Sequence, residues 1–304
     1  MRKRLGRERF GMIVGLPILI LLVGGGWVIW RLNADLDDIE ARQLEWSLLG
    51  TLFWQHLKVT AAAAVAVLVT AIPLGVLLTR PRFRRFSGPV IAIANAGQAT
   101  PVIGLIVLLA MWIAFDFWTA VLALAIYAFL PVLRNTMVGL QQVDQTLVEA
   151  ARGMGMSQMA TLLRIEMPLA APIIMAGVRT ALVLVVGAAS FATFVNAGGL
   201  GALIVTGITL FRYPILVSGA VIIAVVALLI AVPLGVAIAL FLTHYAPKWL
   251  AKPAASLVDL LAAVPSIVYG LWGANIVAQY FDPVGTFLNK YLGWIPLFGD
   301  ASNS

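Results

Sequence analysis

The sequence contains no cysteine and only two histidines, His56 and His244, among its 304 residues. Without cysteine there is no disulfide framework, no thiolate nucleophile and no zinc site of the cysteine type. The two histidines lie far apart along the chain, which argues against a metal site built from histidine. We therefore expect no metal, no other cofactor and no catalytic centre, and the chain is predicted not to be an enzyme.

Charged residues are scarce as well. They make up 11% of the chain, whereas soluble domains contain about 25%, and 62% of the residues are hydrophobic. Several apolar runs exceed the roughly 20 residues that a helix needs to cross a bilayer. Because every backbone polar group within lipid needs an internal partner, these runs must be helical. The composition predicts an all-α integral membrane protein.

Seven apolar helices are predicted. The first follows five basic residues, and its apolar run is long for a secretory signal peptide and lacks a clear cleavage site, so we favour a membrane anchor. The predicted spans are residues 10–30, 57–78, 88–114, 118–138, 170–195, 214–243 and 254–280.

The net charge of +7 could indicate a nucleic-acid partner, but the basic residues form short clusters between the apolar runs. With the N-terminus in the cytoplasm, fifteen of the twenty Lys and Arg residues fall on the cytoplasmic side. This distribution is typical of membrane proteins, and it predicts a cytoplasmic N-terminus and no nucleic-acid partner. The acidic segment 32–50 is then external, as an interfacial helix or an ordered loop.

The longest predicted cytoplasmic connection, residues 139–169, has a local pattern of its own. Thr146 and Glu149 fit a capping box, which predicts the start of a short helix. Gly155, with Gly153 before it, should end that helix, since glycine adopts a left-handed cap easily. Ser157 can cap a second helix, which a proline eleven residues later should stop. Two short helices at a sharp angle are therefore expected.

The same loop resembles the EAA loop of ABC importer permeases, whose pattern is EAA, three residues, G, nine residues, I, one residue, LP. Only Met167 departs from it, standing where leucine is usual. In that family the loop docks on a separate cytoplasmic ATPase, which implies the fold of a type I ABC importer transmembrane domain. For Glu149, closing a capping box is the simpler role, and both roles are compatible. The matching residues are Glu149, Ala150, Ala151, Gly155, Ile165 and Pro168.

From about residue 55 to 217 the chain resembles permeases for glycine betaine, choline and related osmoprotectants. The matching stretches include ANAGQATPVIGLIVLLA, VEAARGMGMS and NAGGLGALIVTGI. The resemblance implies three protein partners: a cytoplasmic ATPase, an extracytoplasmic substrate-binding protein and a second permease subunit in a homodimer or heterodimer. It also implies the bacterial inner membrane as location. No phosphate-binding motif of the form GxxxxGK[ST] occurs, so ATP hydrolysis is expected in the partner.

The C-terminal part departs from this pattern. From about residue 225 it resembles the start of a phosphate ABC permease, and residues 72–76 recur in similar form as residues 232–236. A natural fusion or truncation, a recombined gene and a designed sequence are all compatible with this join. We predict three parts: an anchor with an acidic segment, 1–50; a permease core, 51–243; and a partial second permease unit, 244–304.

Polar side chains within the spans are costly and are therefore candidates for function. Asn95 and Gln98 share one helix face, and either a translocation pathway or interhelical hydrogen bonding explains them equally well. Asn196 is a third candidate for the translocation pathway, and the glycine-rich stretch that begins with it is predicted to form an external re-entrant turn or gate. The rivals to an ABC permease are a secondary transporter, a membrane enzyme and a fusion that no longer transports. The first would need an inverted repeat, and the second would need clustered polar groups at membrane depth.

Overall fold

The computed structural model describes the backbone of residues 2–244 and most side chains between residues 15 and 230. Within this part every regular element is a helix, as the sequence predicted. The helices are α1 Arg2–Asn33, α2 Asp38–Gln43, α3 Trp46–Thr79, η1 Arg84–Phe86, α4 Ser87–Ala99, α5 Val102–Trp112, α6 Phe117–Gln141, α7 Gln145–Gly153, α8 Gln158–Thr161, η2 Leu162–Glu166, α9 Met167–Ala188, η3 Ala189–Val195, α10 Gly201–Thr209 and α11 Tyr213–His244. The predicted seventh span, 254–280, and nearly all of the predicted part 244–304 lie outside the described residues.

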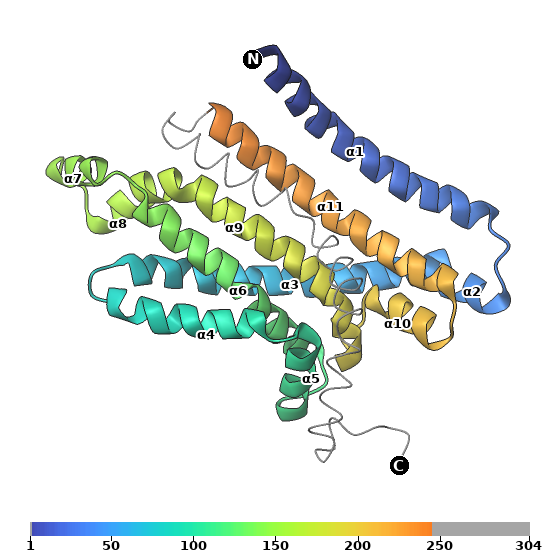
Figure 1. The fold of residues 1–304 in the computed structure, drawn as a ribbon. Coiled ribbons are helices and arrows are strands. Elements are labelled where there is room, and N and C mark those ends of the chain that lie inside the picture. Colours follow the sequence, from blue (N-terminus) through green and yellow to red (C-terminus); the bar gives the residue numbers. More distant parts are fainter. Residues whose placement is uncertain (1, 245–304) are drawn as a thin grey trace, which may run out of the picture. The chain divides into compact units, whose positions relative to one another are not determined.

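Three long helices, α3, α6 and α9, form the centre of this fold and bury one continuous apolar core (Figure 1). Small residues lie where their backbones meet. A Cβ atom at Gly177 of α9 would lie 2.6 Å from the carbonyl oxygen of Pro131 in α6, and one at Gly75 of α3 would lie 2.8 Å from the side chain of Thr136. In lipid, where packing rather than water exclusion drives helix association, small residues permit such close approach. The three helices thus form a tightly packed frame.

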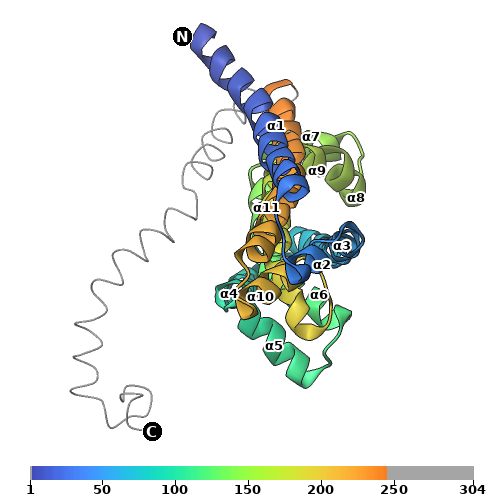
Figure 2. The ribbon, with the colours of Figure 1, turned by 90° about the vertical axis from the view of Figure 1, so that its right-hand side faces the viewer.

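α1 lies alongside α11 (Figures 1 and 2). The indole N–H of Trp27 donates a hydrogen bond to the Ser218 hydroxyl oxygen over 2.9 Å. The predicted first span is therefore part of a helix, although its described apolar portion, Pro17–Asn33, is shorter than the roughly 20 residues of a typical span. The acidic segment after it, for which a helix and an ordered loop were both expected, contains a short helix, α2, which Asp37 caps with a complete capping box.

The predicted span 88–114 is not one continuous helix. It is divided into α4 and α5, whose axes differ by 101°. The break falls at Thr100, whose backbone is extended (φ −68°, ψ 135°), and at Pro101, which precedes the first turn of α5. A proline disfavours the helical conformation of the residue before it, so the sequence Thr-Pro ends α4. The chain therefore changes direction within an apolar stretch.

Four helical segments of the described residues are long and apolar enough to cross a membrane, and the bent pair α4–α5 makes a fifth if it is counted as one broken span. The predicted total of seven spans and the predicted orientation stay predictions. The four segments are Trp46–Thr79, Phe117–Gln141, Gln158–Val195 and Tyr213–Ile230.

Candidate coupling elbow and glycine turn

Residues 144–168, which we call the elbow, begin at the N-cap of α7. The sequence pattern predicted this cap at Thr146, two residues too late. Asp144 is the N-cap of α7, and its carboxylate accepts a hydrogen bond of 2.9 Å from the backbone N–H of Thr146. That bond holds the pKa of Asp144 below its usual range. The predicted capping box at Thr146 and Glu149 is wrong because Thr146 already lies inside the helix. Asp144 satisfies the first free N–H group instead.

The end of α7 is as predicted. Gly155 has a left-handed backbone (φ +83°) and follows the helix by two residues. Its N–H bonds to the carbonyl oxygen of Arg152 over 2.9 Å, and the N–H of Met156 bonds to the carbonyl oxygen of Ala151 over 3.1 Å. These two bonds form a complete Schellman motif, a common glycine-dependent way to end a helix. The chain leaves α7 in a fixed direction.

Ser157 then caps the next helix, as expected, by accepting a hydrogen bond from the N–H of Ala160 over 3.2 Å. The expectation that Pro168 would stop this helix is wrong. The helix passes through the π-helical turn η2, in which the N–H of Met167 bonds to the carbonyl oxygen of Leu162, five residues back. A wider turn relieves the clash that a proline causes in a regular helix. Pro168 therefore lies in the first turn of α9.

The elbow presents one face to solvent and the other to its own subunit. Glu149, Ala150 and Gly155 are exposed, and so is Met154, whose side chain is 77% exposed. Ala151 is only 1% exposed and packs inward. Of the other two motif residues, Ile165 is half-buried and Pro168 is exposed. The motif therefore divides into residues that a partner can reach and residues that fix α7 to the bundle.

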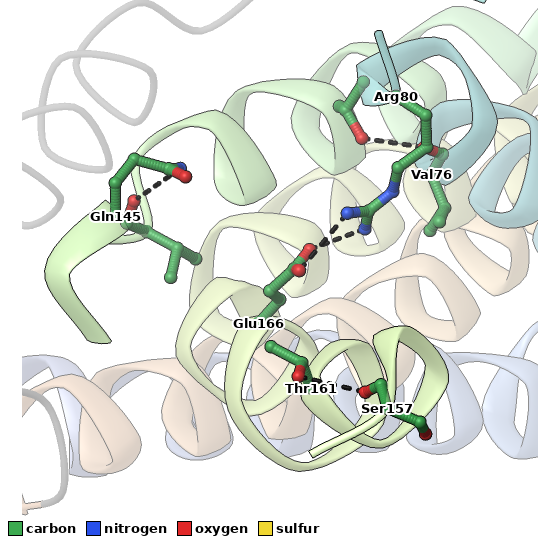
Figure 3. A network of polar contacts seen from close by, with 8 residues as sticks. Val76, Arg80, Gln145, Ser157, Thr161 and Glu166 are labelled. Carbon is green, nitrogen blue, oxygen red and sulfur yellow. Dashed lines mark hydrogen bonds and ion pairs between the residues drawn. The ribbon is translucent and has the colours of Figure 1, made fainter. Parts of the chain in front are cut away.

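An ion pair joins the elbow to the end of α3, and sequence reasoning did not find it. The guanidinium of Arg80 donates two hydrogen bonds to the Glu166 carboxylate, at 3.2 and 2.5 Å (Figure 3). Glu166 is 5% exposed, so its charge requires this partner. Its position gave one usable signal: it is a single acid two residues before Pro168, at the start of an apolar run. Such an acid usually has a specific cation beside it.

At the other end of α9 lies a second compact feature, residues 196–201, which we call the glycine turn. Asn196, Gly198 and Gly199 all have positive φ values of 60°, 71° and 105°. Gln55 of α3 fixes the turn, since its side-chain oxygen accepts a hydrogen bond of 3.0 Å from the N–H of Gly199. A turn is present here, and its glycines supply conformations that other residues adopt at a cost. Its external, re-entrant position and its role as a gate stay predictions. Asn196 itself is exposed.

His56, next to Gln55, lies under the glycine turn. It is 1% exposed, and its Nε2–H donates a hydrogen bond to the carbonyl oxygen of Val186 over 3.0 Å. Val186 lies just before α9 gives way to the 3₁₀ helix η3. The two side chains from α3 thus fix both the glycine turn and the end of α9.

The two polar residues predicted on one face, Asn95 and Gln98, do lie together, in the last turns of α4 just before the break at Pro101. Asn95 is exposed and Gln98 half-exposed. Neither side chain makes a hydrogen bond to another helix in the described part of the chain, so the interhelical alternative is not seen within one subunit. Asn196, the third candidate for the pathway, lies after η3.

No group of three His, Asp or Glu side chains that could bind a metal ion occurs among the residues the structure describes.

Comparisons with known proteins agree with this arrangement. The family model described as the binding-protein-dependent transport system inner membrane component matches residues 71–235, more than half of the chain. The carnitine transport permease protein OpuCD of Listeria monocytogenes is 42% identical over 184 residues, which cover 60% of this chain and 82% of that protein. The glycine betaine/carnitine/choline transport system permease protein OpuCB of Bacillus subtilis is 36% identical over 182 residues, 60% of this chain and 83% of that protein.

A solved structure supports the fold. The MetNI methionine ABC transporter in an inward-facing conformation matches with a TM-score of 0.55 at 24% identity, over 63% of this chain and 94% of the matched chain. The chain therefore belongs to the family of binding-protein-dependent transport system inner membrane components, the multi-pass permeases of ABC importers in the bacterial inner membrane.

Proposed function

We propose that this chain is the subunit through which a small osmoprotectant, such as glycine betaine, choline or carnitine, crosses the inner membrane. An extracytoplasmic binding protein delivers the substrate, and a separate ATPase docks on the elbow from the cytoplasm. The permease relatives that name a substrate supply the substrate class, because they are named for carnitine and for glycine betaine, carnitine and choline. The elbow couples the ATPase to the membrane-spanning helices.

The observation that supports the coupling role is the division of the elbow into an exposed and an anchored face. Glu149 and Ala150 on α7, and Met154 directly after it, are exposed, and both ends of this helix are fixed by hydrogen bonds. Ala151 is buried, and Glu166 is bound to Arg80. A short helix that is fixed in this way can transmit the movement of a docked partner to α3 and α9 without bending. Small exposed residues also permit close approach of a partner surface.

For the pathway, we propose that the exposed polar face of α4, with Asn95 and Gln98, meets the second permease subunit. The break at Pro101 leaves backbone groups of the chain free of helix bonding near these residues. Non-helical backbone is tolerated at membrane depth only where protein or a water-filled cavity surrounds it. The glycine turn would close the outer end of the pathway, since its first residue, Asn196, is exposed.

The coupling role is tested by co-purification of the ATPase with the permease complex. We expect Glu149→Arg to reduce the retained ATPase by about tenfold, since it reverses a charge on the exposed face of α7. Asp38→Arg is the matched control, because it makes the same change on an exposed residue of α2, next to the opposite end of α3. Equal retention of the ATPase by both variants would refute the docking surface.

The substrate class is tested separately by uptake of labelled glycine betaine, choline, carnitine and phosphate in cells that express the complex. Uptake of a quaternary ammonium compound, lost in the Glu149→Arg variant, is the expected result. Uptake of phosphate instead would favour the family that residues from about 225 onward resemble.

A further inference from the structure

We propose that a pocket beside the elbow binds the phosphate group of an anionic phospholipid. The pocket has a volume of about 460 Å³, within the range of small-ligand sites. It lies between the end of α3, the loop that contains η1, the end of α6, and the inward face of α7. Its lining residues are Thr79, Arg80, Pro81, Arg84, Leu140, Gln141, Gln145, Val148, Arg152 and Glu166.

The charge of the lining favours an anion. Three arginines face one carboxylate, and that carboxylate already accepts both of its hydrogen bonds from Arg80. Arg84 and Arg152 donate no side-chain hydrogen bond to any residue in the described part of the chain. Gln141 and Gln145 also line the pocket with polar side chains, although the amide nitrogen of Gln145 already donates a hydrogen bond to the carbonyl oxygen of Val143. The guanidinium group of arginine offers two parallel N–H donors, which match two oxygens of a phosphate group. The arginines of the pocket therefore suit a phosphate better than an anion with a single charged atom.

The position of the pocket, at the ends of two candidate spans, favours a lipid over a soluble anion. Thr79 and Gln141 are the last residues of two of the candidate spans, so the pocket lies where the apolar stretches end. Phospholipid headgroups occupy that level, and basic pockets between spanning helices bind them. The adjoining loop also exposes two aromatic rings, Phe83 at 39% and Phe86 at 45%. The guanidinium groups of the neighbouring Arg82 and Arg85 lie over these rings. Aromatic rings of this kind are enriched at membrane–water interfaces.

A bound headgroup would also brace the elbow. Val148 and Arg152, which line the pocket, lie on α7 together with the exposed residues of the proposed docking face. A phosphate between Arg84 and Arg152 would link α7 to the loop after α3, next to the link that Arg80 and Glu166 already make. The cytoplasmic position of the pocket rests on the proposed function, but the binding of lipid does not depend on an ATPase.

The test is lipid retention by the purified full chain, measured by native mass spectrometry during titration with phosphatidylglycerol or phosphatidylcholine. The double variant Arg84→Gln with Arg152→Gln is expected to lose about tenfold in retention of phosphatidylglycerol. The matched control, Arg82→Gln with Arg85→Gln, removes two charges from the same loop outside the pocket and is expected to lose about twofold or less. Thermal unfolding in neutral detergent should be unchanged in both variants, because all four side chains are exposed.

Equal losses in the two double variants would overturn the proposal, and so would equal retention of phosphatidylcholine by the wild-type chain. Inorganic phosphate that displaces phosphatidylglycerol at similar concentrations would show a site for a soluble anion and would also overturn it. ATPase retention, measured in parallel, separates this proposal from the coupling role. Lipid loss with normal ATPase docking would leave the proposed function intact, and the reverse result would leave the pocket intact.

Discussion

The elbow and the glycine turn lie at opposite ends of α9, and each uses glycine with a positive φ value, but they are built differently. In the elbow, Asp144, Gly155 and Ser157 make their hydrogen bonds to residues within a few positions. The glycine turn instead depends on Gln55, which is 144 residues away in the chain. The elbow is an exposed local structure with one long-range ion pair, whereas the glycine turn is packed against its neighbours.

This difference predicts how each region responds to change. A local, exposed turn can distort by itself and leave the bundle intact. A packed turn transmits its distortion to the helices around it, because buried atoms have little room to move. Mutations in the glycine turn should therefore reduce the stability of the whole subunit, and mutations in the elbow should reduce mainly its docking.

The largest effect is expected for Gly201→Ala, at the end of the glycine turn. A Cβ atom there would overlap the carbonyl oxygen of Ser190, and a backbone atom cannot move aside. We expect the substitution to lower the free energy of unfolding by about 3 kcal/mol or more. Gly187→Ala is the control, since no atom lies within 4 Å of a Cβ at that position. Thermal unfolding of the two variants in the same detergent measures the difference, and matching midpoints would contradict the close packing.

In the elbow, the corresponding change is Gly155→Ala. Here no atom lies within 4 Å of a new Cβ, so the cost comes only from the left-handed backbone at φ +83°. That cost is about 1–2 kcal/mol for a residue with a side chain. We expect a several-fold loss of ATPase retention with nearly unchanged thermal unfolding of the subunit. Gly153→Ala, in the last helical position of α7, should affect neither measurement; a loss as large as that of Gly155→Ala would show that the backbone conformation is not the cause.

The same contrast explains which features the sequence predicted. Gly155 and Ser157 were predicted correctly because their partners lie within the same short segment. Asp144 was missed because Thr146 and Glu149 also fit a capping pattern, and the pattern alone does not choose between two starts that lie two residues apart. The stop at Pro168 was wrong because the π-helical turn before it admits the proline, and no residue type marks such a turn.

Features that join distant segments were beyond local patterns. Arg80 and Glu166 are 86 residues apart, and nothing near either residue specifies the other. The apolar runs predicted most of the helices, but hydropathy alone did not show that Thr100 and Pro101 divide one run into two helices. The family motif found the exposed Glu149 and Ala150, yet it did not show that Ala151 is buried between them and the bundle.

The smallest effect is expected for substitutions of Asp144. They test whether a change in the elbow stays within the elbow, as its short-range hydrogen bonds indicate. Its folded-state pKa is lowered, chiefly by the backbone N–H of Thr146, so the cap is fully formed above the ordinary aspartate pKa of about 3.9. The cap is lost only as the pH falls through this lowered pKa. Titration of Asp144 should therefore cause no change in ATPase retention between pH 5 and pH 8.

Asparagine caps helices about as well as aspartate and does not titrate, whereas alanine provides no acceptor. Asp144→Asn should consequently retain the ATPase as the wild-type chain does, and Asp144→Ala should reduce retention by about two- to threefold, equally at pH 5 and pH 8. Thermal unfolding of the subunit should be the same in all three proteins, because the cap bonds only to Thr146 in its own helix. A lower unfolding midpoint for Asp144→Ala would show that α7 contributes to the stability of the bundle, and the elbow would then resemble the glycine turn more closely than its hydrogen bonds indicate.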